Sequence, residues 1–308
     1  MILRKWTCRA LCLILVFSWV ATAFAAGDSQ TGTHWAASVL QKWQDNGWIH
    51  GYPDGSLKPD APVKRAEFAA LINRAFQLKE EKAGVSFVDL PASHWASHEI
   101  AIAVEAGYLK GNDQNKVNPD SRTTRQEAAV MIAALLKLPA PTIVDLSAWS
   151  DASEIAEWSK SSIAAVAAAG IMKGDASGKF RPKAFITRAE TVASLDAALG
   201  LSQATKTFDK PGEYGSAASA PETIVGNVAI TSAGVTLRNM VITGNLLLGQ
   251  EIKDGDVTLD HVNVKGTTTV RGGGEHSIHV TDSVLVRVIV DKTGGKVRIV
   301  ASGSTSVQ

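Results

Sequence analysis

Three copies of one pattern constrain this chain more than any other feature of its sequence. Each copy holds a tryptophan, with a glycine 12 residues later, a second glycine 16 later, a proline 24 later and an arginine 30 later. The tryptophans are Trp35, Trp95 and Trp158, the glycines are Gly47, Gly107 and Gly170 and then Gly51, Gly111 and Gly174, the prolines are Pro59, Pro119 and Pro182, and the arginines are Arg65, Arg125 and Arg188. The copies stand 60 and 63 residues apart, while the spacing inside each is constant. Each copy is therefore one structural unit of a repeat protein.

Each unit is predicted to contain two helices joined by a loop. Apolar residues after the tryptophan, and the glycine 12 positions after it, indicate a short amphipathic helix that ends at a residue able to adopt a positive φ. A loop rich in Gly, Asp and Asn follows and ends at the proline. The arginine then begins a second helix, because Thr124 with Glu127 and Thr187 with Glu190 have the spacing of a capping box. Lys64 occupies the cap position in the first copy, so we expect a weaker cap there.

The arginines are the residues of the repeat best suited to bind a ligand. A guanidinium at a helix N-terminus lies beside free backbone amides and the positive end of the helix dipole, and this arrangement suits a carboxylate. The second glycine of each unit lets a ligand approach the backbone closely. We therefore expect the arginines to contact ligand and the three tryptophans to lie in the hydrophobic core. The alternative is that the arginines pair with neighbouring carboxylates.

These units resemble the S-layer homology domain, which occurs in triplets that attach bacterial surface proteins to the cell wall. The resemblance covers residues from about 28 to 200 and rests on the tryptophan helix, the glycine loop and the arginine motif, which is Ile186 to Glu190 in the third copy. It implies an all-α bundle with pseudo-threefold symmetry, in which the helices that follow the motif meet at the centre. We expect the repeats at 28–80, 86–140 and 145–202, with binding grooves between neighbours.

The resemblance also implies which residues bind and what they bind. The ligand would be a secondary cell-wall polysaccharide, often bearing a pyruvate ketal, whose acidic groups meet the arginines while glycine and aspartate positions hydrogen-bond the sugar. The implied polysaccharide-binding residues are Arg65, Arg125, Arg188, Gly51, Gly111, Gly174, Asp28, Asp89 and Asp151. Gln126 and Lys64 depart from the family's motif, so not every groove need be active.

The first 25 residues have the pattern of a secretory signal peptide. Basic residues precede an apolar run from Ala10 to Val20, and Ala23 to Ala25 offers a small-residue cleavage site. A transmembrane anchor is the alternative, but the run is shorter than the roughly 18 to 20 residues that a span requires. Both cysteines lie in this segment, so we expect no disulfide or thiolate site after cleavage. We therefore expect a protein secreted to the cell wall or surface layer of a bacterium, and not in the membrane.

The C-terminal part of the chain differs from the repeats in composition and in the period of its apolar residues. Residues 203–221 are rich in Gly, Ser, Ala and Pro and are predicted to be a linker. Residues 222–308 alternate in strand fashion, and the segment from Val235 to Gly244 resembles the segment from Val257 to Gly266. This period of 22 residues predicts an all-β domain, a short parallel β-helix of three or four turns, with a β-sandwich as the alternative.

No catalytic site is visible in the sequence. Asp254 with Asp256, His276 with His279, and His94 with His98 have spacings that metal sites use, but none has an evident third ligand. We expect no enzyme, no cofactor, no metal and no nucleic-acid partner. The favoured hypothesis is a wall-anchored surface protein that displays a β domain. The alternatives are a carbohydrate-active enzyme whose site lies in the β domain, and a self-assembling surface-layer subunit that associates through that domain.

Overall fold

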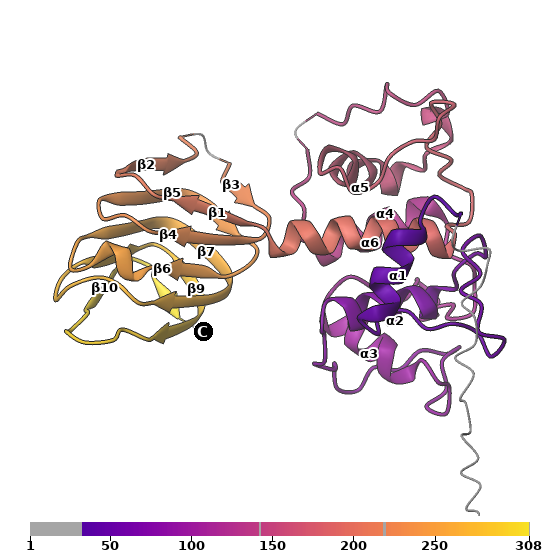
Figure 1. Ribbon diagram of the computed structural model, residues 1–308, viewed down its shortest axis with the longest axis horizontal. Coiled ribbons are helices and arrows are strands. Elements are labelled where there is room, and N and C mark those ends of the chain that lie inside the picture. Colours follow the sequence, from indigo (N-terminus) through magenta and orange to yellow (C-terminus); the bar gives the residue numbers. More distant parts are fainter. Residues whose placement is uncertain (1–32, 142, 218–219, 308) are drawn as a thin grey trace, which may run out of the picture.

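The computed structural model describes residues 33–141, 143–217 and 220–307, as a helical region followed by a β domain (Figure 1). The expected signal peptide and Asp28 lie outside these residues. The helices are α1 (Ala37–Asp45), α2 (Arg65–Ala75), α3 (Ser97–Glu105), α4 (Arg125–Leu135), the 3-10 helix η1 (Ala152–Glu154), α5 (Glu157–Ala168) and α6 (Arg188–Gln203). Each predicted unit thus supplies one helix after its tryptophan, or starting beside it, and a second that begins at its arginine.

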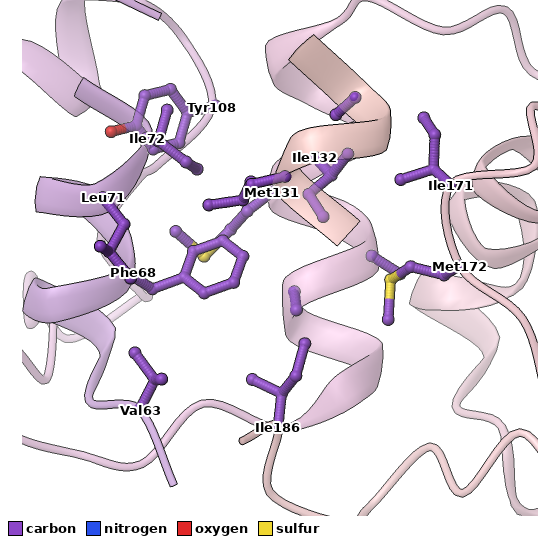
Figure 2. Close-up of a cluster of buried hydrophobic side chains, with 14 of the residues drawn as sticks. Val63, Phe68, Leu71, Ile72, Tyr108, Met131, Ile132, Ile171, Met172 and Ile186 are labelled. Atoms are coloured by element: carbon purple, nitrogen blue, oxygen red, sulfur yellow. The ribbon is translucent and has the colours of Figure 1, made fainter. Parts of the chain in front are cut away.

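A ring of three backbone hydrogen bonds joins the units at the centre of the helical region. The residue two positions before each arginine donates its N–H to the matching carbonyl of another unit: Val63 to Ile186 (3.0 Å), Ile186 to Thr123 (2.9 Å) and Thr123 to Val63 (2.9 Å). Figure 2 shows the apolar side chains that pack around this ring, including Phe68 and Met131. The predicted pseudo-threefold bundle is confirmed, because the closed ring relates the three units cyclically.

The helix starts follow the predicted capping. Thr124 and Thr187 complete both halves of a capping box at α4 and α6. At α2 the Glu67 carboxylate accepts from the Lys64 amide (2.9 Å), but Lys64 has no side-chain acceptor to return the bond. The first cap is therefore the weaker one, as the sequence predicts.

The three repeat tryptophans are not in the core, so that expectation was wrong. Trp35, Trp95 and Trp158 are 65%, 54% and 59% exposed. The buried positions of the first helix begin five residues later, at Leu40 in α1, and its fully buried aromatic is Trp43. A tryptophan at or just before the first turn lies above the buried stripe, so its ring remains on the surface.

The β domain is a parallel β-solenoid, which confirms the predicted β-helix and excludes the sandwich. Its strands are β1 (Thr205–Phe208), β2 (Gly212–Gly215), β3 (Glu222–Ile224), β4 (Asn227–Ile230), β5 (Val235–Ile242), β6 (Leu246–Leu248), β7 (Val257–Val270), β8 (Ile278–Thr281), β9 (Val284–Val290), β10 (Ile299–Ser302) and β11 (Ser306–Val307), with a 3-10 helix η2 (Gln250–Ile252). All of their pairings are parallel. In β5 the pairing with β7 matches Val235 to Val257, so the 22-residue period is the length of one turn.

The solenoid interior is filled by alternate residues of the central strands, such as β5 and β7. Leu237 and Leu259 are fully buried in paired strands. The corner between two faces is formed by Asn239, His261 and Asp282, one in each of three successive turns, all at positive φ. The short polar or ring side chains at this corner tolerate the left-handed conformation better than the β-branched residues around them.

The prediction of a linker at residues 203–221 was wrong, because most of this segment belongs to the solenoid. Within 203–221, β1 pairs with β4 and β2 pairs with β5, and they form the first turn. The solenoid therefore has about five turns and not three or four. These strands are mostly exposed, with Phe208 as the buried residue of β1, so they lack the alternating apolar pattern by which the later strands were predicted.

Helix α6 leads directly from the helical region into the solenoid (Figure 1). It ends at Gln203, and β1 begins at Thr205. The Ala204 carbonyl accepts from the amide of Asn227 (2.8 Å), and Val225 packs against the core of the helical region. Among the described helices, none has the length and apolar character needed to cross a membrane.

Candidate functional site

Three equivalent sites form where the arginine of one unit meets the loop of the next. The first arginine site joins Arg65 to the loop 110–118, the second joins Arg125 to the loop 173–181, and the third joins Arg188 to the loop 50–58. In each, the arginine amide donates to a carbonyl just beyond the loop of the neighbouring unit, with distances of 2.8 to 2.9 Å. The second helix of that unit and the first helix of the remaining unit lie alongside, since α2 packs with α3, α4 with α5 and α6 with α1.

Two of the arginines use their guanidinium groups for structural contacts between units. Arg125 is 5% exposed and donates from Nε to the Phe180 carbonyl (2.8 Å) and from Nη2 to the Lys173 carbonyl (2.9 Å). Its Nη1 also contacts the Glu190 carboxylate at 3.1 Å. Buried carbonyls paired by a charged fork stabilise the contact between units.

Arg188 repeats this arrangement at the third site. It is 6% exposed and donates to the carbonyls of Leu57 (2.7 Å) and His50 (2.8 Å). The Tyr52 ring lies 4.9 Å from its guanidinium carbon, as the Phe180 ring lies 5.1 Å from that of Arg125. Both guanidinium groups are thus covered by an aromatic ring and bonded to loop carbonyls.

Arg65 differs from both. Its side chain is only partly buried, and its guanidinium makes no hydrogen bond or ion pair with any residue in the described parts of the chain. Burial lowers the pKa of Arg65, and the neighbouring Glu127 carboxylate raises it in part. A cation that is withdrawn from water without a hydrogen-bond partner is energetically costly. This arginine is therefore the one of the three that is prepared for an external anion.

A groove of about 630 Å³ lies in front of Arg65. Lys110, Lys116 and Arg122 line it together with Glu127, and so the cations outnumber the carboxylate. One further wall is the half-exposed ring of Trp158, which α5 of the third unit presents. A cationic groove with an exposed indole face suits a sugar that carries an acidic group.

The predicted glycines and aspartates act inside their own units. Asp89 accepts from the amides of Val117 (2.9 Å) and Asn118 (2.7 Å), so it fixes the loop 110–118. Burial opposes the charge of Asp89, but these two amides, its own amide and the Lys116 cation together hold the pKa of the carboxyl below its ordinary value. The buried Asp151 accepts likewise from Phe180 and Arg181, at 2.9 and 2.8 Å.

The glycines allow close packing beneath the loops. A Cβ at Gly111 would lie 2.6 Å from the ring of Phe87, and one at Gly174 would lie 2.6 Å from the indole of Trp149. At Gly51 the close neighbour is the Gly55 carbonyl oxygen, 2.9 Å from a Cβ. Of the described residues predicted to bind polysaccharide, the groove brings together Arg65 and Gly111, and the remaining ones do not line it.

Sequence reasoning missed the groove's tryptophan and two asparagines. Trp158 was singled out in the sequence but assigned to the core. Nothing in the sequence marked Asn112 and Asn118 as site residues, because their importance lies in the contrast with the larger or charged residues at the equivalent positions of the other units. The paired histidines of the sequence are engaged elsewhere: His94 contacts Asp120 at 3.4 Å, and His98 contacts Glu81 at 2.8 Å. No cluster of three or more potential metal ligands occurs among the residues that the structure describes.

The family comparison agrees with this architecture. The model of the S-layer homology domain matches residues 30–69, 86–129 and 150–192. The helical region is a triplet of S-layer homology domains. Each match contains a first helix and the start of an arginine-motif helix, so the family model and the threefold ring define the same three units.

Relatives of the triplet include surface-layer proteins and an exoglucanase. The chain is 32% identical over 194 residues to the surface-layer 125 kDa protein of Lysinibacillus sphaericus, covering 62% of this chain and 16% of that protein. It is 42% identical over 114 residues to the S-layer protein sap of Bacillus anthracis, covering 37% and 13%. It is 31% identical over 164 residues to the exoglucanase XynX of Acetivibrio thermocellus, covering 53% and 15%.

These alignments share one limit. The chain spans only 15 to 16% of the length of the first two of its curated relatives. What the triplet and its surface-layer relatives support in common is a protein anchored at the surface of the cell.

Proposed function

We propose that the triplet anchors this protein non-covalently to the bacterial cell wall by binding an acidic wall polysaccharide, with the β-solenoid displayed beyond it. The ligand that the groove suits best is a glycan bearing a carboxylate, of which a pyruvate ketal is an example. The bound sugar would place its carboxylate on Arg65 and one face of its ring against Trp158.

The observation that carries this proposal is the unpaired guanidinium of Arg65. Its two counterparts are bonded to carbonyls, so their charge is already satisfied. A carboxylate in the groove would supply the missing bidentate partner, and an Arg–carboxylate pair of this kind is among the stronger hydrogen-bonded contacts in proteins. The lysines of the groove add attraction that is local, because the whole chain has a formal net charge of only +1.

Among the described residues of the solenoid we find no arginine site of this kind. Several of its outward-facing charges are paired with each other, as in the contacts of Arg238 with Asp260 (3.0 Å) and of Arg271 with Asp291 (3.1 Å). We assign it the role of a displayed domain, and self-association through it stays a prediction.

Co-sedimentation with purified wall sacculi tests the anchoring. We expect the protein to sediment with intact walls and to stay in solution when the secondary polymer has been removed. Arg65→Ala should weaken wall binding by about 10- to 100-fold, which corresponds to loss of one charge-assisted contact of about 1.5 to 3 kcal/mol. Arg74→Ala is the matched control, because it removes the same charge from the exposed end of the same helix and does not line the groove.

Two results would contradict the proposal. Equal binding to intact and polymer-free walls would show that the polysaccharide is not the ligand. Equal loss of binding in Arg65→Ala and Arg74→Ala would show that only net charge matters and that the groove has no special role.

A further inference from the structure

We infer that the triplet binds one glycan per chain, because loop residues of the third and first units close the second and third arginine sites, while two asparagines in the loop of the second unit leave the first site open. This inference rests on the proposed function and adds to it the residues that decide which site is available. It concerns the loop positions 112 and 118 and their equivalents, 175 and 181 in the third unit and 52 and 58 in the first.

The second site is filled by its own loop. Arg181 extends from the end of the loop to the Glu190 carboxylate (2.8 Å) and to Asp175 (3.0 Å). One oxygen of Glu190 thereby contacts both Arg125 and Arg181. An anionic ligand there would have to compete with two carboxylates that already hold the arginines.

The third site is closed by an aromatic ring. Tyr52 occupies the loop position equivalent to Asp175, and its ring lies 4.9 Å from the guanidinium of Arg188. Lys58, equivalent to Arg181, holds its ammonium 4.3 Å from the same ring and 3.2 Å from Asp54. The ring therefore covers the guanidinium face that a ligand would approach.

The first site has neither feature. Asn112 turns its side-chain oxygen back to the loop amides of Gln114 (3.0 Å) and Lys116 (2.9 Å). Asn118 makes no side-chain hydrogen bond within the described residues, and Glu127 bonds only to Thr124, through its N–H and hydroxyl at 2.7 Å. Among the residues that the structure describes, no loop cation forms an ion pair with Glu127 and no aromatic ring stacks on Arg65, so the space between them is the groove.

The backbone allows the closing residues to be exchanged. Lys58, Asn118 and Arg181 all adopt positive φ, at 44°, 49° and 56°. An arginine is therefore accommodated at this loop position in the second site, and placing one at position 118 adds no conformation that the fold does not already contain. This makes a transplant of the closure a fair test.

The experiment is isothermal titration of the protein with a hexose glycoside that carries a pyruvate ketal. We expect a stoichiometry of one for the unaltered protein. The double variant Asn112→Asp with Asn118→Arg, which copies Asp175 and Arg181 into the first site, should weaken binding at least tenfold while Arg65 is intact. Asn115→Arg is the control: it adds the same charge at another positive-φ position of the same loop that does not line the groove, and we expect its affinity to stay within about twofold.

Each failure has its own meaning. A stoichiometry of two or three, unchanged binding by the double variant, or a loss in Asn115→Arg as large as in the double variant would overturn the inference. Titration of Arg65→Ala separates this from the proposed function: if that variant binds the glycoside normally, the ligand is not in the first site and the proposed function itself fails. Far-ultraviolet circular dichroism of each variant verifies that the helices are retained.

Discussion

Replacing Arg188 or Arg65 by alanine should change the stability of the triplet in different ways. Arg188→Ala removes two charge-assisted hydrogen bonds and leaves the carbonyls of Leu57 and His50 without their donors. Arg65→Ala removes a cation that has no hydrogen-bond partner among the described residues. The first change should destabilise the triplet, and the second should leave its stability unchanged or slightly increased.

The size of the difference follows from the contacts. Hydrogen bonds to a charged group contribute about 1.5 to 3 kcal/mol each, so Arg188→Ala should lower the free energy of unfolding by about 3 to 5 kcal/mol. With a urea dependence of about 2 to 3 kcal/mol per molar, the midpoint should fall by about 1.5 M. For Arg65→Ala we expect a shift of less than about 0.3 M in either direction, because the desolvation cost of the unpaired cation offsets its packing contacts.

Tryptophan fluorescence during urea unfolding measures this in the full chain. Every tryptophan lies at or before Trp158, and so the signal reports on the helical region and not on the solenoid. Equal destabilisation by the two substitutions would refute the reasoning, because it would mean that Arg65 makes structural contacts equivalent to those of Arg188. A fall in midpoint for Arg65→Ala alone would refute it as well.

Two further predictions concern the groove and its loop. Trp158→Ala should weaken co-sedimentation with sacculi several-fold and leave the urea midpoint nearly unchanged, because the ring is 59% exposed; a large loss of stability without loss of wall binding would contradict this. The pKa of Asp89 is lowered in the folded state, so its contribution to stability is present above the ordinary value of 3.8 and is lost as the pH falls through the folded pKa. When urea unfolding is measured at a series of pH values from 6 downward, the midpoint concentration should decrease once the pH is below about 4. This decrease should be less steep in Asp89→Asn. Identical pH profiles for the two proteins would contradict the role of this carboxylate.

The fold of the helical region could be predicted because the same sequence pattern occurs in all three of its repeats. The capping residues and glycines fixed the helix ends, and the constant spacing fixed the units. The tryptophans were misassigned because an aromatic residue beside an amphipathic helix is compatible with either face. Only the packing of Leu40 and Trp43 shows that the buried stripe of α1 begins one turn later.

The candidate site could be predicted only in part, for a physical reason. The three arginine motifs are nearly the same in sequence, so they predict three equivalent sites. What separates Arg65 from Arg125 and Arg188 is the loop of the next unit, about 50 residues along the chain or, for Arg188, more than 100 residues back. Asn112 and Asn118 leave the groove beside Arg65 open because their side chains do not extend into it. This effect can be recognised only when the three units are packed together in the structure.

The start of the solenoid was missed for a different reason. β1 and β2 are held to β4 and β5 by backbone hydrogen bonds and expose most of their side chains. A strand at the end of a solenoid has fewer neighbours to cover it, so its sequence is under less demand for apolar alternation. Its Gly- and Ser-rich continuation then resembles a linker.

The most direct test of the account is a crystal structure of the protein with a pyruvate-ketal glycoside bound. The account predicts density for the sugar in the first groove, with its carboxylate in bidentate contact with Arg65 and its ring against Trp158, while Arg125 and Arg188 keep their carbonyl partners. A sugar bound at the second or third site, or an empty first groove with Arg65 turned onto the carbonyls of Lys110 and Val117, would contradict it.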